Sequence, residues 1–161
     1  MDKTHKILPV VHFVRLSANN VLKICDLSDT LNKEQRRFVV DNARSIAQAH
    51  YSNQVWMRAI YDEETPVGFF MLHLGSNWDD GIDCPGVFLW RFMIAEPFQG
   101  KGYGKAAINL LIKHLRAFGI PELYTSYHLG EGGPENFYRQ LGFLPTGEYY
   151  GDEPEAVLKI Q

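Results

Sequence analysis

The segment FMIAEPFQGKGYGKAAINLLIKHL, residues 92–115, joins an apolar run to a helical pattern through a turn that holds three glycines. The run that leads into it, VFLWRFMIA, has no alternation of polar and apolar residues, which is typical of a strand covered on both faces. After the turn, apolar residues recur at helical spacing until a Gly-Ile-Pro tripeptide ends the pattern. The core face expected for this helix consists of Ala107, Leu111, His114 and Phe118, flanked by Leu110 and Leu115.

The glycine-rich turn has the composition of an anion site. The first N–H groups of a helix lack partners within the helix and lie at its positive end, so they suit a phosphate. Gly100, Gly102 and Gly104 let a ligand approach the backbone, and Lys101 and Lys105 add positive charge. The same residues would also suit a plain tight turn with solvated lysines, so the turn alone leaves both interpretations open.

Two common phosphate motifs do not fit this turn. A Walker loop needs a glycine where the sequence has Gln99 and a hydroxyl residue where it has Ala106. A dinucleotide fingerprint needs a third glycine where the sequence has Lys105, and it belongs to an opening βαβ unit. The sequence therefore supports neither phosphoryl transfer nor dinucleotide binding.

The sequence before the segment predicts two helices. Ser17 suits the N-cap of a helix over residues 18–27. A capping box of Asn32 and Gln35 favours a second, continuous helix over residues 33–50.

The predicted elements alternate along the whole chain. Strands are expected at 10–16, on both sides of a turn at 62–66, at 87–95, at 122–129, and in a final hairpin at 142–150 and 155–160. A short helix is expected from Pro134 to Gly142. The order β-α-α-β-β-β-α-β-α-β-β, without a linker, predicts one α/β domain over residues 10–161 after an extension at 1–9.

Composition argues against several other classes of protein. The formal net charge of -3 and the pI near 6.0 give no overall attraction to nucleic acid or to an anionic membrane. Cys25 and Cys84 form no CxxC pair and have no metal-ligand spacing, so we expect no disulfide framework, no metal and a reducing compartment. The sequence also lacks a signal peptide pattern and a membrane-spanning apolar run, so a cytoplasmic location is expected.

Two motifs together resemble those of the Gcn5-related N-acetyltransferase (GNAT) superfamily. In QGKGYG, the positions of Gln99, Gly102 and Gly104 match the Q/R-x-x-G-x-G/A pattern of its acetyl-CoA loop. In ENFYRQLGF, Tyr138 is followed four residues later by Gly-Phe, as in the later motif of that family. The motifs occur in the order and spacing of the family, and the resemblance covers roughly residues 10–160.

The resemblance implies the acyl-CoA N-acyltransferase fold, with acetyl-CoA as co-substrate and no metal. In that fold a mixed, mostly antiparallel sheet is flanked by helices, and the strand before the CoA loop splays from the next strand, here 122–129. The acyl group lies in the gap, the pyrophosphate lies on the turn, and the pantetheine arm pairs with the strand edge. The residues expected to bind acetyl-CoA are Phe92, Met93, Ile94, Gln99, Gly100, Lys101, Gly102, Tyr103, Gly104 and Lys105.

The resemblance makes Tyr138 the expected catalytic acid, which protonates the CoA thiolate as it leaves. Members of the family often place a carboxylate base on the strand before the CoA loop, but VFLWRFMI has none and carries Arg91, for which we expect a structural ion pair. Glu131 is the preferred candidate for base or ammonium ligand, ahead of His128. The alternatives are a packing role for Tyr138 and a solvated loop position for Glu131.

The expected substrate is a primary amine of a small polycation, a diamine or polyamine. LWRFMIAEPFQGKGYGK and GFLPTGE are similar to the bacterial diamine and polyamine acetyltransferases, and the acidic stretch NWDDGIDC would attract a cation. The expected substrate-binding residues are Trp78, Asp79, Asp80 and Asp83. A peptide or protein amine, an aminoglycoside, an amino acid and a non-catalytic acyl-CoA sensor stay open as alternatives. Neither cysteine lies in a motif, so direct transfer is expected, and the resemblance also allows a homodimer.

Overall fold

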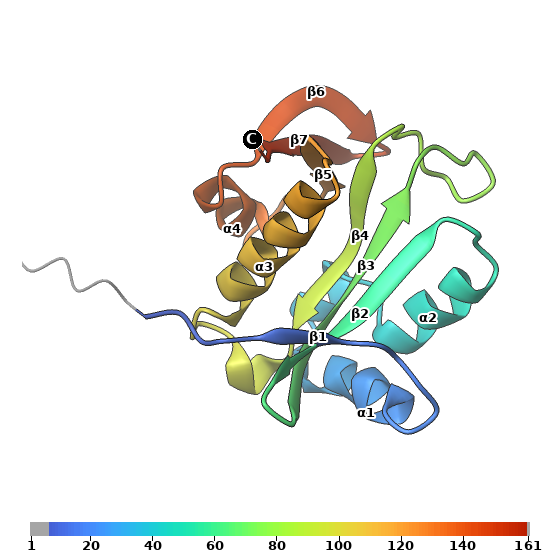
Figure 1. The fold of residues 1–161 in the computed structure, drawn as a ribbon. Coiled ribbons are helices and arrows are strands. Elements are labelled where there is room, and N and C mark those ends of the chain that lie inside the picture. The colour runs from blue at the N-terminus through green and yellow to red at the C-terminus, as the bar shows by residue number, and fades with distance from the viewer. Residues whose placement is uncertain (1–6, 161) are drawn as a thin grey trace, which may run out of the picture.

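Seven strands form one sheet in the order β1-β2-β3-β4-β5-β7-β6 in the computed structural model, which describes residues 7–160 (Figure 1). The strands are β1 (His12–Val14), β2 (Val55–Asp62), β3 (Thr65–Leu74), β4 (Val87–Ile94), β5 (Glu122–Ser126), β6 (Leu144–Tyr150) and β7 (Glu153–Lys159). The α-helices are α1 (Val21–Asp26), α2 (Asn42–His50), α3 (Tyr103–Ala117) and α4 (Glu135–Gln140), and the 3-10 helices are η1 (Leu27–Thr30), η2 (Gln35–Arg37) and η3 (Glu96–Phe98). Among the described strands β4 and β5 pair in parallel and the other neighbours are antiparallel. The predicted mixed, mostly antiparallel sheet is confirmed.

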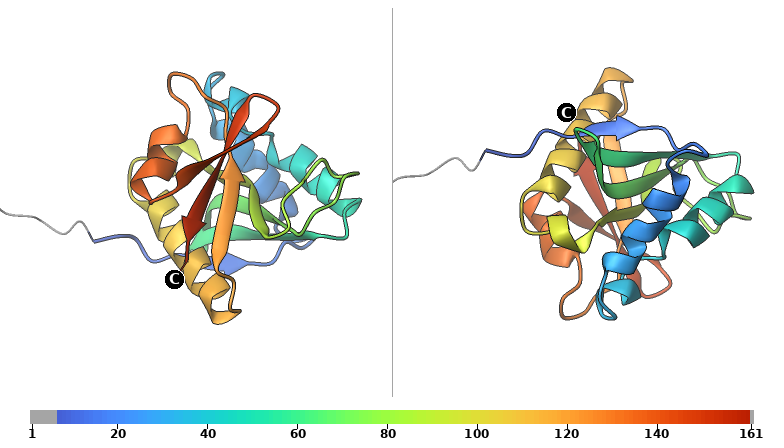
Figure 2. Two further views of the ribbon diagram at one scale, coloured as in Figure 1. Left: turned by 90° about the horizontal axis from the view of Figure 1, so that it is seen from above. Right: turned by 90° about the horizontal axis from the view of Figure 1, so that it is seen from below.

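The helices cover both faces of the sheet (Figures 1 and 2). On one face, α3 and α4 contribute Leu111 and Tyr138 to the larger apolar cluster. On the other face, α1 and α2 contribute Ile24 and Ala49 to a second cluster. Residues of β4 belong to both clusters, so the prediction of a strand buried from both sides is confirmed.

The sheet opens between β4 and β5. Their pairing begins at Val87↔Leu123 and ends at Leu89↔Thr125, whereas the pairing of β4 with β3 continues to Ile94. Beyond Leu89 the two strands therefore separate, which is the splay that the resemblance implied.

A β-bulge lies where the sheet opens. Two adjacent residues of β3 pair with Arg91 and Leu89, so Trp90 is an extra residue of β4. Trp90 packs against the cluster under α1 and α2. Arg91 donates to Oε1 of Gln48 on α2, and its guanidinium lies 5.0 Å from the centre of the Trp90 ring. The bulge thus places two consecutive side chains on the same face of the sheet.

The continuous helix predicted over residues 33–50 is wrong. The capping box does form, since the backbone N–H groups of Asn32 and Gln35 each donate to the side chain of the other at 3.1 and 2.9 Å. It opens only η2, however, and α2 has its own N-cap, Asp41, which accepts a bond from Arg44 N at 2.9 Å. Two adjacent β-branched valines stand between the helices, and such residues favour helix less than unbranched ones do.

The first helix begins later than predicted. α1 starts at Val21, with Asn20 rather than Ser17 at its N-cap. Asn20 Oδ1 accepts a bond from Ser17 N at 2.9 Å, and Asn20 Nδ2 donates to Arg15 O at 2.9 Å. Local bonding of an asparagine side chain to the backbone competes with helix, so it holds this segment in a turn.

The predicted core face of α3 is correct only in its first part. Ala107 and Leu111 are buried, but His114 is exposed and Phe118 keeps 81% of its surface exposed. Leu115 occupies the inward position, four residues after Leu111, because residues four apart share a helix face. Phe118 follows the last residue of the helix and points away from the core.

The segment before β1 lies beside the start of α3. A Cβ added to Gly102 would lie 3.1 Å from Leu8 and 3.2 Å from Pro9. The domain boundary at residue 10 stays a prediction, and residues 1–6 of the expected extension lie outside the described residues. Within residues 7–160, no helix is both long enough and apolar enough to cross a membrane.

Candidate active site

An open cleft of ≈ 1370 Å³ lies where β4 and β5 separate, and we call it the splay cleft. Most of its wall comes from β4 between Phe88 and Ile94, the glycine turn before α3, the end of β5 with α4, and α1 and α2 with the connection between them. The loop before β4 and the β6–β7 hairpin complete it. The two sequence motifs, although far apart along the chain, therefore open into one space.

The glycine turn presents its backbone to the splay cleft. Gly100 and Gly102 have φ values of 72° and 91°, a region that favours glycine, and Gly102 is the N-cap of α3 without a side-chain cap bond. A Cβ on Gly104 would lie 3.0 Å from Cε2 of Phe137. All three glycines and Lys105 line the cleft. Uncapped N–H groups at a helix start beside a lysine suit an anion such as a phosphate.

Other residues of the predicted CoA loop are held by the protein itself. Gln99 donates to Ile94 O at 2.8 Å and accepts from Nε2 of Gln35 at 2.7 Å, so it ties the turn to β4 and η2. The Tyr103 hydroxyl donates to the Asp62 carboxylate at the end of β2, which raises the pKa of Tyr103. Lys101 is exposed and is not among the residues that line the cleft.

The free edge of β4 lines the splay cleft at Phe92, Met93 and Ile94. These residues pair with β3 on one side, and none of the described strands pairs with their other side. Phe92 stacks on Phe137 of α4 with ring centres 5.8 Å apart, whereas Met93 packs toward α1 and α2. Their side chains thus belong to the core, while an unpaired strand edge can accept an extended group.

Tyr138 lies on α4 beside the splay cleft and is 6% exposed. Its ring stacks on Tyr127 at 5.5 Å and meets Phe143 edge to face at 5.3 Å. Burial raises the pKa of the Tyr138 phenol well above its ordinary value, and the nearby Thr125 hydroxyl opposes this shift only in part. Thr125 also donates to Leu89 O at 3.1 Å, so the phenol lies near the last paired residues of β4 and β5.

The acidic loop, residues 77–86, places its predicted substrate ligands differently. Trp78 is 77% exposed, and Asp79 and Asp83 are exposed, but none of these three lines the splay cleft. Asp80 does line it. The structure therefore separates one carboxylate of the loop from the other predicted ligands.

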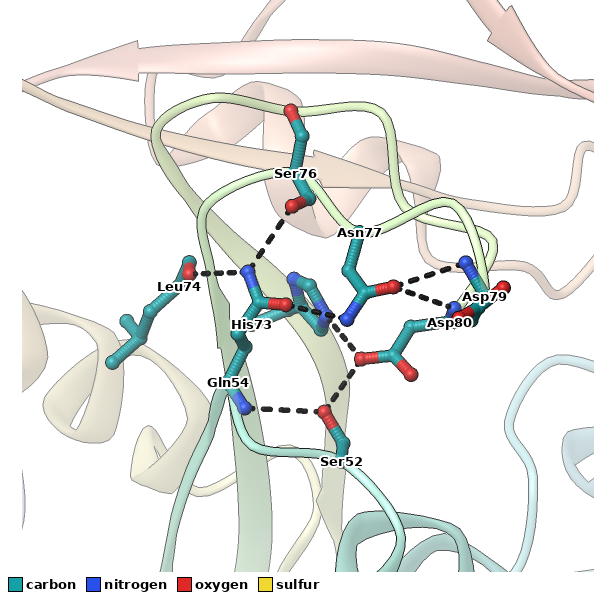
Figure 3. A network of polar contacts seen from close by, with 8 residues as sticks. All are labelled: Ser52, Gln54, His73, Leu74, Ser76, Asn77, Asp79 and Asp80. Atoms are coloured by element: carbon teal, nitrogen blue, oxygen red, sulfur yellow. Dashed lines mark hydrogen bonds and ion pairs between the residues drawn. The ribbon is translucent and has the colours of Figure 1, made fainter.

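Asp80 anchors the acidic loop to the body of the protein (Figure 3). Its Oδ2 accepts from the Ser52 hydroxyl at 2.5 Å and lies 2.8 Å from Nε2 of the fully buried His73. The bond from Ser52, followed by that of His73, lowers the pKa of the Asp80 carboxyl. Asn77 adds a bond to Gln54 Oε1 at 2.6 Å. The part of the cleft wall that this loop forms is thus held by the buried His73 and by partly buried polar side chains.

Glu131 lies in the turn between β5 and α4 and is exposed. It is not among the residues that line the splay cleft, although its neighbours Gly132 and Gly133 are. Its role as base or ammonium ligand stays a prediction.

The ion pair predicted for Arg91 is wrong among the described residues. The guanidinium donates to Trp90 O and to Gln48 Oε1, both at 3.0 Å, and no carboxylate lies within ion-pair distance in residues 7–160. Burial lowers the pKa of Arg91, and its Nε is buried without a partner. The bulge explains this, because it turns Arg91 toward α2, where an amide faces it.

Two residues of the β6–β7 hairpin that the sequence did not single out line the splay cleft, Tyr150 and Glu153. Burial raises the pKa of Tyr150. Glu153 Oε2 lies 4.0 Å from Nε2 of His128, which also lines the cleft. No local motif marks these residues, because pairing between β5 and β7 brings them to the site. No group of three metal-ligating side chains occurs in the described part of the chain.

The sequence and fold match known proteins. The acetyltransferase (GNAT) family model matches residues 24–143. A protein of Bacillus subtilis (strain 168) named spermine/spermidine N(1)-acetyltransferase is 29% identical over 143 residues, which cover 86% of this chain and 90% of that protein.

Two solved structures share the fold. One is an acetyltransferase from Salmonella typhimurium that modifies the N-terminal serine of the 50S ribosomal protein L7/L12, with a TM-score of 0.70, 16% identity and coverage of 94% and 96% of the two chains. The other is the PaiA N-acetyltransferase from Thermoplasma acidophilum in complex with coenzyme A, with a TM-score of 0.65, 16% identity and coverage of 92% and 98%. At this identity the likeness concerns the fold.

Proposed function

The chain belongs to the acetyltransferase (GNAT) family, and from this premise we propose that it transfers acetyl from acetyl-CoA directly to a primary amine of a small polyamine. The observation that carries the proposal is the splay cleft, into which the glycine turn, the free edge of β4 and the buried Tyr138 all open. Together they offer a phosphate site, an extended track and a proton donor in one space.

The described residues fit acetyl-CoA. The uncapped start of α3, with Gly100, Gly102 and Gly104 in the cleft wall, would receive the pyrophosphate, and Lys105 would add charge. The edge at Phe92, Met93 and Ile94 would pair with the pantetheine arm. Gln99 and Tyr103 would act by fixing the turn, Gln99 through Ile94 and Gln35 and Tyr103 through Asp62, and Lys101 would contribute charge from outside the cleft.

Tyr138 is proposed as the catalytic acid. A thiolate leaves when the amine has attacked the thioester, and a thiol has an ordinary pKa of about 8.5. The raised pKa of Tyr138 keeps its phenol protonated at neutral pH, so it can donate a proton to the leaving sulfur. Because C–N bond formation needs a neutral amine, the ammonium must first lose a proton, and Glu131 is proposed to bind that ammonium or to act through water.

A polyamine is the proposed substrate class. The relative named spermine/spermidine N(1)-acetyltransferase covers most of the chain, and the acidic loop presents Asp79 and Asp83 beside the exposed indole of Trp78. Carboxylates and an aromatic face suit the distal ammonium groups of a polyamine. Asp80 would shape the wall of the site. We place the reaction in the cytoplasm.

One observation favours a second substrate class. Arg91 and Arg44 line the splay cleft on the side of α2, and Arg91 has no carboxylate partner in residues 7–160. An amine that carries a carboxylate, such as an amino acid or a peptide, would complement these cations.

The test is thiol release from acetyl-CoA with a panel of polyamines, diamines, amino acids, lysine peptides and aminoglycosides. Turnover confined to polyamines and diamines is expected. Turnover confined to amino acids or peptides would support the acetyltransferase activity but contradict the polyamine as substrate. Tight binding of CoA without thiol release from any amine would instead identify an acyl-CoA sensor.

A further inference from the structure

His128 and Glu153 come together at the mouth of the splay cleft because of strand register. β5 and β7 pair antiparallel, with Ser126 opposite Glu155. His128 follows the end of β5 by two residues and Glu153 is the first residue of β7, so a continuation of this register beyond β5 leads His128 toward Glu153. The distance from Nε2 of His128 to Oε2 of Glu153 is 4.0 Å, and both side chains line the cleft.

The histidine and the proposed acid contact different parts of the fold. Tyr127, the residue before His128, stacks on Tyr138 on the side of α4. His128 instead has its nearest carboxylates in the β6–β7 hairpin, Glu153 and Asp152. The splay cleft is thus lined both by Tyr138, which is held on the side of α4, and by His128, which lies beside the β6–β7 hairpin.

We propose that His128, in place of a route from Glu131 through water, is the general base that takes the proton from the substrate ammonium, and that Glu153 is its positioning residue. This inference rests on the proposed acetyl transfer. An alkylammonium with a pKa of about 10.4 is under about 0.1% neutral at pH 7, so the reaction needs a base near the attacking nitrogen. Imidazole is the side chain whose ordinary titration lies closest to neutral pH.

The protons balance over one turnover. His128 takes one proton from the ammonium, and the nitrogen lone pair then forms the C–N bond to the thioester carbon. The nitrogen loses a second proton as the C–S bond breaks, and Tyr138 gives one proton to the thiolate and regains one. The products are one amide, one thiol and one released proton. The His128 side chain is 46% exposed, so it can pass its proton to solvent.

The charges around His128 support this role. Asp152 Oδ1 lies 3.9 Å from Nδ1 and Glu153 Oε2 lies 4.0 Å from Nε2, so two carboxylates face the imidazolium that proton transfer creates. Arg91, on β4, repels a positive charge on the substrate nitrogen. The negative charge of Glu153 acts on Arg91 and raises its pKa, against the larger effect of burial. Asp80 lines the same cleft from the acidic loop. The hairpin thus places two carboxylates beside the imidazole that receives the proton.

The experiment compares His128→Gln and Glu153→Gln with two matched controls, His50→Gln and Glu148→Gln. Both control residues are exposed and neither lines the splay cleft. Thiol release is measured at saturating acetyl-CoA and amine from about pH 6 to about pH 10, where the amine becomes neutral in solution. Binding of CoA is measured by calorimetry and folding by thermal unfolding.

His128→Gln should lower kcat about tenfold or more at pH 7, with a smaller loss at high pH and unchanged CoA binding. Free imidazole should restore part of the activity of His128→Ala. Glu153→Gln should shift the acid limb of the pH profile, and Glu153→Asp should recover part of that shift. Both controls should match the wild type.

A wild-type pH profile and kcat in His128→Gln would overturn the inference while acetyl transfer stands. A large loss in Glu131→Gln beside an intact His128→Gln would move the base to Glu131 and also overturn it. Absence of thiol release by the wild-type protein with every amine would remove the proposed function itself and the inference with it, so the two failures are distinguishable.

Discussion

Oδ2 of Asp80, in the acidic loop, lies 2.8 Å from Nε2 of His73, which has no exposed surface. The other ring nitrogen of His73 is buried and has no partner among residues 7–160, so Asp80 supplies the polar contact of that ring. The His73 ring and the ring of Trp90, the extra residue of the bulge, pack edge to face with their centres 5.2 Å apart. Through His73, the Asp80 carboxylate therefore connects the acidic loop, which lines the splay cleft, to β4, the strand with the bulge.

Asp80→Asn should lower the free energy of unfolding by about 1–3 kcal/mol, because it removes a charged hydrogen-bond acceptor from a buried histidine. The folded protein lowers the pKa of Asp80, so its contribution is fully present above the ordinary carboxyl pKa of about 3.9 and is lost as the pH falls through the lower folded value. Urea unfolding at several pH values measures this. A difference between the wild type and Asp80→Asn that persists at the acid end would contradict the assignment.

Tyr138→Phe should lower kcat about tenfold or more while the dissociation constant of acetyl-CoA stays within about twofold, because the phenol acts on the leaving thiolate. The ring contacts with Tyr127 and Phe143 remain, so the melting temperature should change little. Tyr149→Phe, at a tyrosine that is 62% exposed on β6, is the matched control. Turnover unchanged by Tyr138→Phe would return Tyr138 to a packing role.

Gly102→Ala tests whether the glycine turn binds acetyl-CoA, and Gly147→Ala, at a glycine with nearly the same φ, is the control. Gly102 and Gly147 have φ values of 91° and 92°, so an alanine at either position costs about 1–2 kcal/mol of backbone strain. Only Gly102 lines the splay cleft, and a Cβ there meets Leu8 and Pro9. Calorimetry should show weaker acetyl-CoA binding for Gly102→Ala and unchanged binding for Gly147→Ala. Equal acetyl-CoA affinity in both variants would mean that the turn does not contact acetyl-CoA.

The acidic loop predicts an effect that depends on salt. Asp79→Asn combined with Asp83→Asn should raise the KM for spermidine several-fold at low ionic strength and much less at about 0.5 M salt, because exposed charges are screened. Glu64→Gln, an exposed acid in the β2–β3 turn, is the control. The KM for acetyl-CoA should stay constant. An unchanged spermidine KM at low salt would remove this loop from amine recognition.

The features that could be predicted from the sequence are those with local signals. The apolar run of β4 and the glycines at 100, 102 and 104 depend only on neighbouring residues, and the structure contains both the strand and the turn. The capping box at Asn32 also forms, yet it could not indicate that the helix stops within one turn. A local signal thus located the beginning of an element better than its length.

The remaining features depend on residues far apart along the chain. Glu153 reaches His128 through the pairing of β5 with β7. The Arg91 side chain reaches Gln48 because of a bulge in β4, and that bulge is defined only by the pairing of β4 with β3. Neither contact has a spacing that one sequence can show, because each is set by the register of two separate strands.

Within residues 7–160, only the pairs from Val87↔Leu123 to Leu89↔Thr125 join β1–β4 to β5–β7 in the sheet. The two halves of the sheet are therefore joined by a few backbone hydrogen bonds at one end of the splay cleft. Beyond them, none of the described strands pairs with the free edge of β4. An extended ligand arm along the free edge of β4 would pair with the backbone groups that the protein itself leaves unpaired there. Binding of such an arm would therefore add backbone hydrogen bonds where the sheet has the fewest, and should make the sheet more rigid.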